Sequence, residues 1–308
     1  MSHWVKSILR KKNIDGIVIF SSPMTQYVTG KEYFSYKRVA DFVDIDSDKW
    51  AQYAKSKPWP ASWIYRRESE FLLKFEKEVA TEFDATVFVS ETEAKMFSCL
   101  LAESSQRIHA IQNGVDSEYF SPDRVYPNPY DPNQKIIVFT GAMDYWANIE
   151  AVTWFVNNVM ADVTEVMPNT VFYIVGSRPS REVISLAKNE NVYVTGSVHD
   201  IRPYIAHADL SVAPMNIARG VQNKVLEAMA MGIPVLATPE AAEGIVAKKG
   251  EDFAVEKGAR NFRMRVIEML KQPPIDMARS GRRCILRNYN WDENLSQFDR
   301  LISIGDMP

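Results

Sequence analysis

The sequence predicts an α/β protein built from two domains with parallel sheets, and three observations support this. Strands rich in β-branched residues and flanked by glycine alternate with helical patterns, which is the rhythm of βαβ units. The 308 residues suffice for two ordinary domains, and 46% hydrophobic with 24% charged residues is a globular composition. The stretch 122–133 holds four prolines and no apolar periodicity, which is typical of a linker.

The first half of the chain supplies only part of such a domain. Strands are expected at 17–20, 39–43, 86–90 and 109–112, and helices near 68–82 and 91–102. A complete doubly wound domain has about six strands, so the N-terminal domain is expected to be partial. We expect its exposed edge, near 17–20 or 39–43, to be covered by a partner chain or by a helix over residues 1–12.

The second half supplies about five strands, which is enough for a doubly wound sheet. They are expected at 135–141, 170–177, 191–196, 209–214 and 233–238, with helices over about 148–166 and 181–189. The expected domains are therefore a partial Rossmann-like domain at 1–123, a linker at 124–133, a second Rossmann-like domain at 134–290, and a C-terminal helix at 291–308 that packs back toward the first domain.

Residues 218–234, ARGVQNKVLEAMAMGIP, have the chemistry of a nucleotide diphosphate site. Gly220 permits a sharp turn, so that a helix begins near Val221 with its free N–H groups and partial positive charge available to phosphate oxygens. Lys224 adds a point charge one turn in, and Arg219 adds a second from the loop. Glu227 shares the face of Lys224 and is suited to accept hydrogen bonds from ribose hydroxyls. The alternative is an ordinary buried βα unit with Glu227 in solvent, although the helix is apolar on nearly every other side.

Composition excludes several classes of function. The two cysteines are too few for a disulfide framework, which favours a reducing cytosol, and neither is expected to be a nucleophile. No apolar run reaches the roughly 18 to 20 residues of a membrane span, and no signal-peptide core is present. A net charge of -3 argues against nucleic-acid binding. The four histidines are scattered, and the acidic run over 41–48 lacks the glycine and terminal Glu of a calcium loop, so no metal is expected.

Several separated motifs, in the correct order, resemble glycosyltransferase family 4, the retaining enzymes of GT-B fold. They are QNGVDSEYFSP at 112–122, FTGAM, YIVGSRP, the run from VTGSVHD to DLSVAP, and the helix that carries Glu227. More narrowly, DFVDIDSDKWAQYA, FTGAMDYWAN and ARGVQNKVLEAMA resemble the sugar transferases associated with PEP-CTERM/exosortase and exopolysaccharide gene clusters. The resemblance covers about residues 14–291.

This resemblance implies a nucleotide-diphosphate sugar as donor, held mainly by the C-terminal domain, and a glycan or lipid-linked acceptor. It implies a hexosyltransferase in exopolysaccharide or cell-surface glycan synthesis that needs no metal or other cofactor. Matched by position, Glu227 binds the ribose, and Asn223, Lys224 and Gly220 meet the diphosphate. Val198 and His199 lie in the loop that faces the base, and Gly141 lets the backbone approach the phosphates or the sugar. His199 as a solvated loop residue and Gly141 as a strand-ending glycine stay open as alternatives.

Two departures from the family pattern affect the donor site. Many members carry a Glu eight positions before the ribose-binding Glu, where this chain has Arg219, so the sugar preference does not transfer. The Arg and Lys that often follow the first strand of the C-terminal domain are also absent. The phosphate charge must then be met by Lys224, Arg219, Arg178 or the helix dipole, unless Arg178 is a plain surface arginine.

Two features of the first half leave function open. Asp44 or Asp46, after a strand on the acceptor side, either orients the acceptor hydroxyl or belongs to a solvated acidic loop. The helix over 1–12 has an apolar side and a cationic side, which suits peripheral contact with the inner face of the membrane, or simply a helix that covers the sheet.

Rival functions are an impaired nucleotide-sugar-binding protein and a GT-B epimerase; a dehydrogenase is disfavoured because no G-x-G-x-x-G follows a strand. No pattern indicates an oligomeric state.

Overall fold

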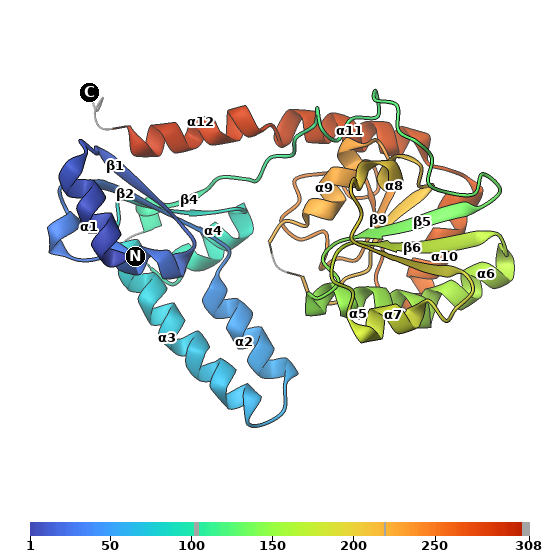
Figure 1. Cartoon of the computed structure of the whole chain (residues 1–308), viewed down its shortest axis with the longest axis horizontal. Helices are drawn as coiled ribbons and strands as arrows, with labels where there is room; N and C mark the ends of the chain where they lie inside the picture. Colours follow the sequence, from blue (N-terminus) through green and yellow to red (C-terminus); the bar gives the residue numbers. More distant parts are fainter. Residues whose placement is uncertain (102–104, 219, 304–308) are drawn as a thin grey trace. The chain divides into compact units, whose positions relative to one another are not determined.

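The computed structural model describes residues 1–101, 105–218 and 220–303, and the chain divides into two compact units (Figure 1). The first unit is Met1–Asn113 with Asp292–Pro308, and the second is Gly114–Trp291. The structure differs here from the expected boundary at residue 123. The Val115 N–H donates to the carbonyl of Tyr289 at 2.8 Å, and the Val115 side chain is buried in the core of the second unit.

The first unit contains a four-stranded parallel sheet in the order β1-β2-β3-β4, which confirms the expected number of strands. Its elements are α1 (Ser2–Lys11), β1 (Gly16–Phe20), η1 (Ser22–Tyr27), η2 (Lys31–Tyr33), β2 (Lys37–Val43), α2 (Asp46–Ser56), α3 (Ala61–Glu82), β3 (Ala85–Phe88), α4 (Glu91–Ser98), η3 (Ser105–Arg107), β4 (Ile108–Ala110) and, from the end of the chain, α12 (Trp291–Ile302).

Helices cover the two faces of this sheet. Val5 and Leu9 of α1 pack against one apolar cluster, and Phe298 and Leu301 of α12 pack against a second cluster on β2 and β3. Strand β1 lies at the edge and pairs only with β2 among the described residues. The helix at the N-terminus therefore acts as a cover for the sheet, although Phe20 of β1 remains 70% exposed.

Helix α2 is an element that the sequence analysis missed. Its first turn carries Asp46 and Asp48, which were interpreted as part of a loop after the strand. Acidic residues are favoured in the first turn because they face the positive end of the helix dipole. Figure 1 shows α2 and α3 side by side as a helical hairpin that projects from the sheet of the first unit.

The second unit contains a six-stranded parallel sheet in the order β10-β9-β8-β5-β6-β7. Its elements are β5 (Lys135–Thr140), α5 (Trp146–Phe155), the π-helix η4 (Val156–Met160), α6 (Ala161–Val166), β6 (Thr170–Val175), α7 (Arg181–Leu186), β7 (Val192–Gly196), α8 (Arg202–Ala206), β8 (Leu210–Ala213), α9 (Asn223–Ala230), β9 (Val235–Ala237), β10 (Ala254–Val255), α10 (Ala259–Lys271) and α11 (Ile275–Asn288). The five expected strands are present, and the sixth, β10, is too short to give a periodic signal.

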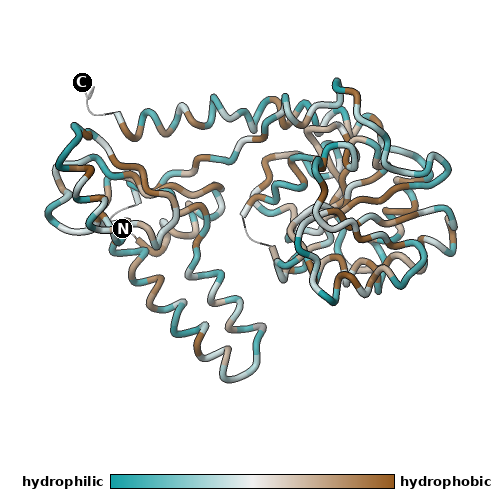
Figure 2. The backbone as a smooth tube through the Cα atoms, viewed as in Figure 1, coloured by the Kyte–Doolittle hydropathy of each residue, from teal (hydrophilic) through white to brown (hydrophobic). Residues whose placement is uncertain are grey.

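The strands of the second unit read as near-continuous apolar runs because both faces of the sheet are covered (Figure 2). The larger core cluster includes the fully buried Phe139, Phe155 and Phe172, and a smaller cluster forms around Tyr130 on the other face. Burial of these aromatic side chains fixes the strand ends, and the ends of β5 and β8 carry the candidate site.

Candidate donor site

The topology of the second sheet identifies one edge as a place for a ligand. Strand β5 is the first strand of the second unit in chain order, and it has β6 on one side and β8 on the other. The strand order therefore reverses between β5 and β8. In open parallel sheets, ligands bind outside the carboxyl ends of the strands at such a switch point. Gly141 directly follows β5, and the segment that follows β8 leads into α9.

The backbone after β5 is held close to the backbone after β6. A Cβ atom on Gly176 would lie 1.7 Å from the carbonyl oxygen of Gly141, so a side chain there cannot fit. The Met143 N–H also donates to the carbonyl of Ser177 at 2.8 Å. The predicted site residue Gly141 thus belongs to a pair of tightly packed loops at the carboxyl edge of the sheet.

Gly220 occupies the turn that precedes α9. Its φ of 61° is left-handed, a conformation that glycine adopts without steric cost. Gln222 is still extended, so α9 begins at Asn223 rather than near Val221. Asn223 is the exposed first residue of the helix, and Arg219 lies outside the described residues.

Lys224 points into the site and is held by three neighbours. Its Nζ donates to Oδ1 of Asn148 at 2.7 Å and lies 3.5 Å from Sδ of Met215. It also lies 4.6 Å from the centroid of the Phe139 ring, a cation–π distance. Lys224 is therefore oriented by α5, β5 and the segment after β8, and not left as a mobile surface lysine.

Asn148 is a site residue that the sequence analysis did not identify. Its Nδ2 donates to the carbonyl of Ala142 at 2.9 Å, which leaves Oδ1 as the acceptor for Lys224. A Cβ on Gly141 would lie 2.7 Å from that Nδ2, so Asn148 also requires the glycine. The available signal was one amide on the otherwise apolar buried face of α5, which carries Ala147, Ala151 and Val152.

The charges of Lys224 and Glu227 are both perturbed by their surroundings. Burial lowers the pKa of Lys224 to about 8, against the opposing effect of Glu227. Burial likewise raises the pKa of Glu227, and the charge of Lys224 opposes that shift. No hydrogen bond from the described residues reaches the Glu227 carboxylate. Gly141, Lys224 and Glu227 thus lie in one site. The attraction between the Lys224 ammonium and the Glu227 carboxylate does not offset the cost of burying either charge, as the two shifted pKa values show.

The other predicted donor residues lie at the same carboxyl edge but outside this cluster. Arg178 has its Nε 3.0 Å from Oδ2 of Asp144, and its side chain is 71% exposed. His199 is exposed in the loop after β7, whereas Val198 packs against the smaller core cluster. Since β7 is two strands from β5, this loop lies about 10 Å from the end of β5 at the usual strand spacing.

The predicted acceptor residues belong to the first unit. Asp46 is the first residue of α2, and its Oδ2 accepts from Ser22 Oγ at 3.3 Å; Asp44 is half-buried between β2 and α2. Glu76 of α3, which was not predicted, accepts hydrogen bonds from the N–H and the hydroxyl of Ser47. Burial raises the pKa of Glu76 to about 7. Glu76 therefore caps α2 beside the two aspartates.

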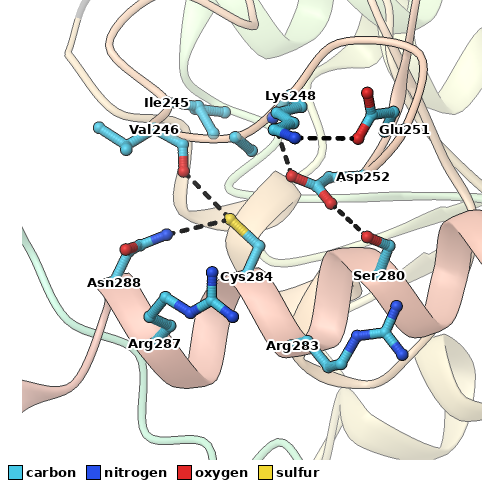
Figure 3. Close-up of a pocket in the computed structure, with 11 residues that line it drawn as sticks. Ile245, Val246, Lys248, Glu251, Asp252, Ser280, Arg283, Cys284, Arg287 and Asn288 are labelled. Atoms are coloured by element: carbon cyan, nitrogen blue, oxygen red, sulfur yellow. Dashed lines mark hydrogen bonds and ion pairs between the residues drawn. The ribbon is translucent and has the colours of Figure 1, made fainter.

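A separate cavity of about 440 Å³ lies between α11 and the loop after β9 (Figure 3). There the Cys284 thiol donates to the carbonyl of Val246 at 3.1 Å, and burial raises its pKa, which suits a structural thiol. Asp252 accepts from Ser280 Oγ at 2.6 Å and from the Lys248 N–H at 2.8 Å. None of the predicted site residues lines this cavity, so we regard it as a structural junction.

The described residues show neither a metal centre nor a membrane-spanning helix. No group of three or more His, Cys, Asp or Glu side chains in that part of the chain is arranged to hold a metal ion. Among the described helices, none combines the length and the apolar character that a membrane span requires.

Comparison with known proteins supports the fold. Residues 134–272 match the family described as glycosyl transferases group 1, and curated protein sequences give no match. Sucrose-phosphate synthase from Thermosynechococcus elongatus superposes with a TM-score of 0.73 at 17% identity, over 97% of this chain and 76% of that one. WaaG, a glycosyltransferase involved in lipopolysaccharide biosynthesis, gives 0.72 at 16% identity, over 98% and 82%. Anabaena HepE in complex with UDP gives 0.71 at 12% identity, over 97% and 80%.

These comparisons confirm the predicted fold class. The chain has the α/β GT-B fold with two parallel sheets, and the part of its second unit over residues 134–272 is similar to the group 1 glycosyl transferases. The cluster around Lys224 and Glu227 lies inside the matched residues.

Proposed function

We propose that the protein transfers a hexosyl group from a nucleotide diphosphate sugar to a glycan or lipid-linked acceptor, with retention at the anomeric carbon and without a bound metal. The observation that carries this proposal is the half-buried Lys224 and Glu227 at the switch point of a group 1 glycosyltransferase domain. The complexes of HepE with UDP and with UDP-glucose support a uridine nucleotide as the first donor to test.

In this proposal each residue of the cluster has a distinct role. The Glu227 carboxylate accepts hydrogen bonds from the ribose hydroxyls, which are strong because the acceptor is charged. Lys224, together with the N-terminus of α9, meets the diphosphate. Asn148 holds the Lys224 ammonium in place through its Oδ1, which is 2.7 Å away. Gly141 keeps the approach to the phosphates open.

The chemistry asks for stabilisation of a leaving group. As the bond between the anomeric carbon and the phosphate oxygen breaks, negative charge accumulates on the diphosphate. Asn148 and the Phe139 ring already hold the Lys224 ammonium in position. It can therefore stabilise that charge without any rearrangement of the site, and electrostatic catalysis is strongest in such preorganised sites. On the acceptor side, Asp44 or Asp46 would orient the attacking hydroxyl. The acceptor would then be an exopolysaccharide or another cell-surface glycan. This role agrees with the resemblance of the chain to the sugar transferases of PEP-CTERM/exosortase clusters.

Calorimetric titration with uridine and with UDP tests the donor site. Glu227→Ala should weaken both ligands by about 1.5 to 3 kcal/mol, the scale of hydrogen bonds to a charged group. Lys224→Ala should weaken UDP but leave uridine nearly unchanged, because it contacts phosphate only. Glu190→Ala and Lys188→Ala are matched controls, since both residues are exposed on the second unit. Unchanged affinity of Glu227→Ala for both ligands would remove the basis of the donor assignment.

A second measurement separates transfer from binding alone. Release of UDP from UDP-glucose in the presence of a glycan acceptor should require both Lys224 and Glu227. Nucleotide binding that depends on both residues, with no release of UDP from any donor tested, would favour an impaired nucleotide-sugar-binding protein. Interconversion of the sugar without transfer would favour the epimerase.

A further inference from the structure

The tip of the α2–α3 hairpin is the part of the first unit whose surface the fold does not explain. We define the tip as residues 55–67, where the chain leaves α2, crosses 57–60 and enters α3 (Figure 1). At the base of the tip, Trp50 of α2 packs against Tyr65 of α3 with ring centroids 5.3 Å apart, and the Tyr53 ring lies 5.7 Å from Trp50 and 6.0 Å from Tyr65. This aromatic cluster fixes the end of the hairpin, so the tip is a built surface.

Large apolar side chains at the tip face solvent. Trp59 is 80% exposed, Trp63 is 60% exposed and Ile64 is 46% exposed. None of the three belongs to the apolar clusters of the first unit. Exposed indoles on a projecting hairpin are costly in water, and exposed apolar patches mark contact with another molecule or a membrane.

The same tip is strongly cationic. The stretch 49–67 carries five lysines and arginines and no Asp or Glu, in a chain whose net charge is -3. The basic residues are Lys49, Lys55, Lys57, Arg66 and Arg67. Among the described residues, one ion pair involves these side chains. It joins Arg67 to Glu68 at 3.7 Å, and both side chains are about half exposed. Such an exposed pair is weak, so the positive charge of the tip is largely uncompensated.

We propose that the hairpin tip docks on the surface of an anionic lipid bilayer. Tryptophan is enriched at membrane interfaces because its ring is apolar and its N–H stays hydrated, which suits Trp59 and Trp63 at headgroup depth. The basic residues that flank them would contact anionic headgroups, which attract clustered cations. Charge complementarity selects this occupant, since an uncharged glycan would make no use of the four basic residues of the tip, three of which have no ion pair among the described residues.

This places the membrane contact away from α1, where the sequence alone suggested it. The apolar side of α1 consists of Trp4, Val5, Ile8 and Leu9; Val5 and Leu9 pack against the core of the first unit, while Trp4 is 64% exposed. Much of the apolar side of α1 is therefore used within the fold. The tip keeps both its indoles and its cations on the surface. The proposal does not depend on sugar transfer, because vesicle binding needs neither donor nor acceptor.

Flotation of the whole protein with lipid vesicles tests the proposal. We expect binding to vesicles of phosphatidylglycerol with phosphatidylcholine, much weaker binding to phosphatidylcholine alone, and a loss of binding as salt is raised. The double variant Trp59→Ala/Trp63→Ala should lower the partition coefficient by about tenfold or more. The triple variant Lys55→Gln/Lys57→Gln/Arg66→Gln should lower it by roughly a hundredfold at low salt.

Matched controls come from α1. Trp4 is 64% exposed on the same unit, so Trp4→Ala removes an indole of similar exposure outside the tip and should bind vesicles as the unchanged protein does. Circular dichroism and UDP affinity should be unchanged in the tip variants. Failure of the unchanged protein to bind anionic vesicles would overturn the proposal, and so would full binding by both tip variants. Capture by a neutral polysaccharide, without binding to vesicles, would assign the tip to glycan instead.

Discussion

The depressed pKa of Lys224 makes a specific prediction about donor binding. Burial lowers that pKa to about 8. A bound diphosphate places negative charge beside the ammonium and favours the protonated form. We therefore expect UDP binding to take up a proton above neutral pH, and Lys224 to be the group that accepts it.

The magnitude follows from the two protonation states. With a pKa of about 8, Lys224 is about 25% protonated near pH 8.5 and about 90% protonated near pH 7. If the bound form is fully protonated, uptake is about 0.75 proton near pH 8.5 and about 0.1 near pH 7. Only the protonated fraction is competent to bind the diphosphate, so the dissociation constant should rise about tenfold from roughly pH 7 to pH 9.

Calorimetry in two buffers of different ionisation enthalpy measures this uptake. Lys224→Met should abolish it and should weaken UDP at all pH values, while Lys188→Met serves as the control that keeps it. Glu227→Gln, which removes the other titrating group of the pair, should leave the uptake above pH 7 in place. Equal uptake near pH 7 and pH 8.5, or uptake that survives in Lys224→Met, would refute the reasoning.

Other variants test the acceptor side and the supporting contacts. The unchanged protein should lose stability as pH rises from about 4.5 to 7, because the folded state keeps a proton on Glu76 that the unfolded state has already released. This contribution is up to about 3 kcal/mol. Glu76→Gln should remove this pH dependence, which is measured as the unfolding midpoint against pH. Asp44→Asn or Asp46→Asn should lower turnover with donor affinity unchanged in calorimetry, and equal loss of affinity in both would place them in the donor site or the fold instead. Asp252→Ala deletes two hydrogen bonds and should lower stability by about 1 to 3 kcal/mol in thermal unfolding, whereas Glu251→Ala, an exposed neighbour, should leave it unchanged.

Sequence patterns predicted the strands well because each strand here is a run of apolar residues that ends at a turn. All nine strands expected from the sequence are present, and the missed β10 has two residues. Helix α2 was missed because its first turn is acidic and follows directly on β2, so the same letters fit a loop. Local sequence does not show that Glu76, 29 residues away from Ser47, caps this helix.

The candidate site was predictable where one segment supplies it and unpredictable where packing does. Gly220, Lys224 and Glu227 come from a single motif, and the structure places that motif at the switch point of the sheet. Asn148 is 76 residues from Lys224, and only the fold of β5 and α5 brings the two together. The degree of burial that lowers the pKa of Lys224 is likewise a property of the packed site and not of the motif.

The absence of the usual Arg and Lys after β5 and the presence of Asn148 are linked by charge. With a second cation at that place, the buried ammonium of Lys224 would meet repulsion, and its pKa would fall further. A neutral amide instead accepts a hydrogen bond from Lys224 and is itself fixed by the Ala142 carbonyl. The site thus holds one buried cation and one buried carboxylate, and under the proposed function phosphate would relieve the first and ribose hydroxyl groups the second. We therefore expect a nucleoside diphosphate to bind more tightly than either free phosphate or a nucleoside.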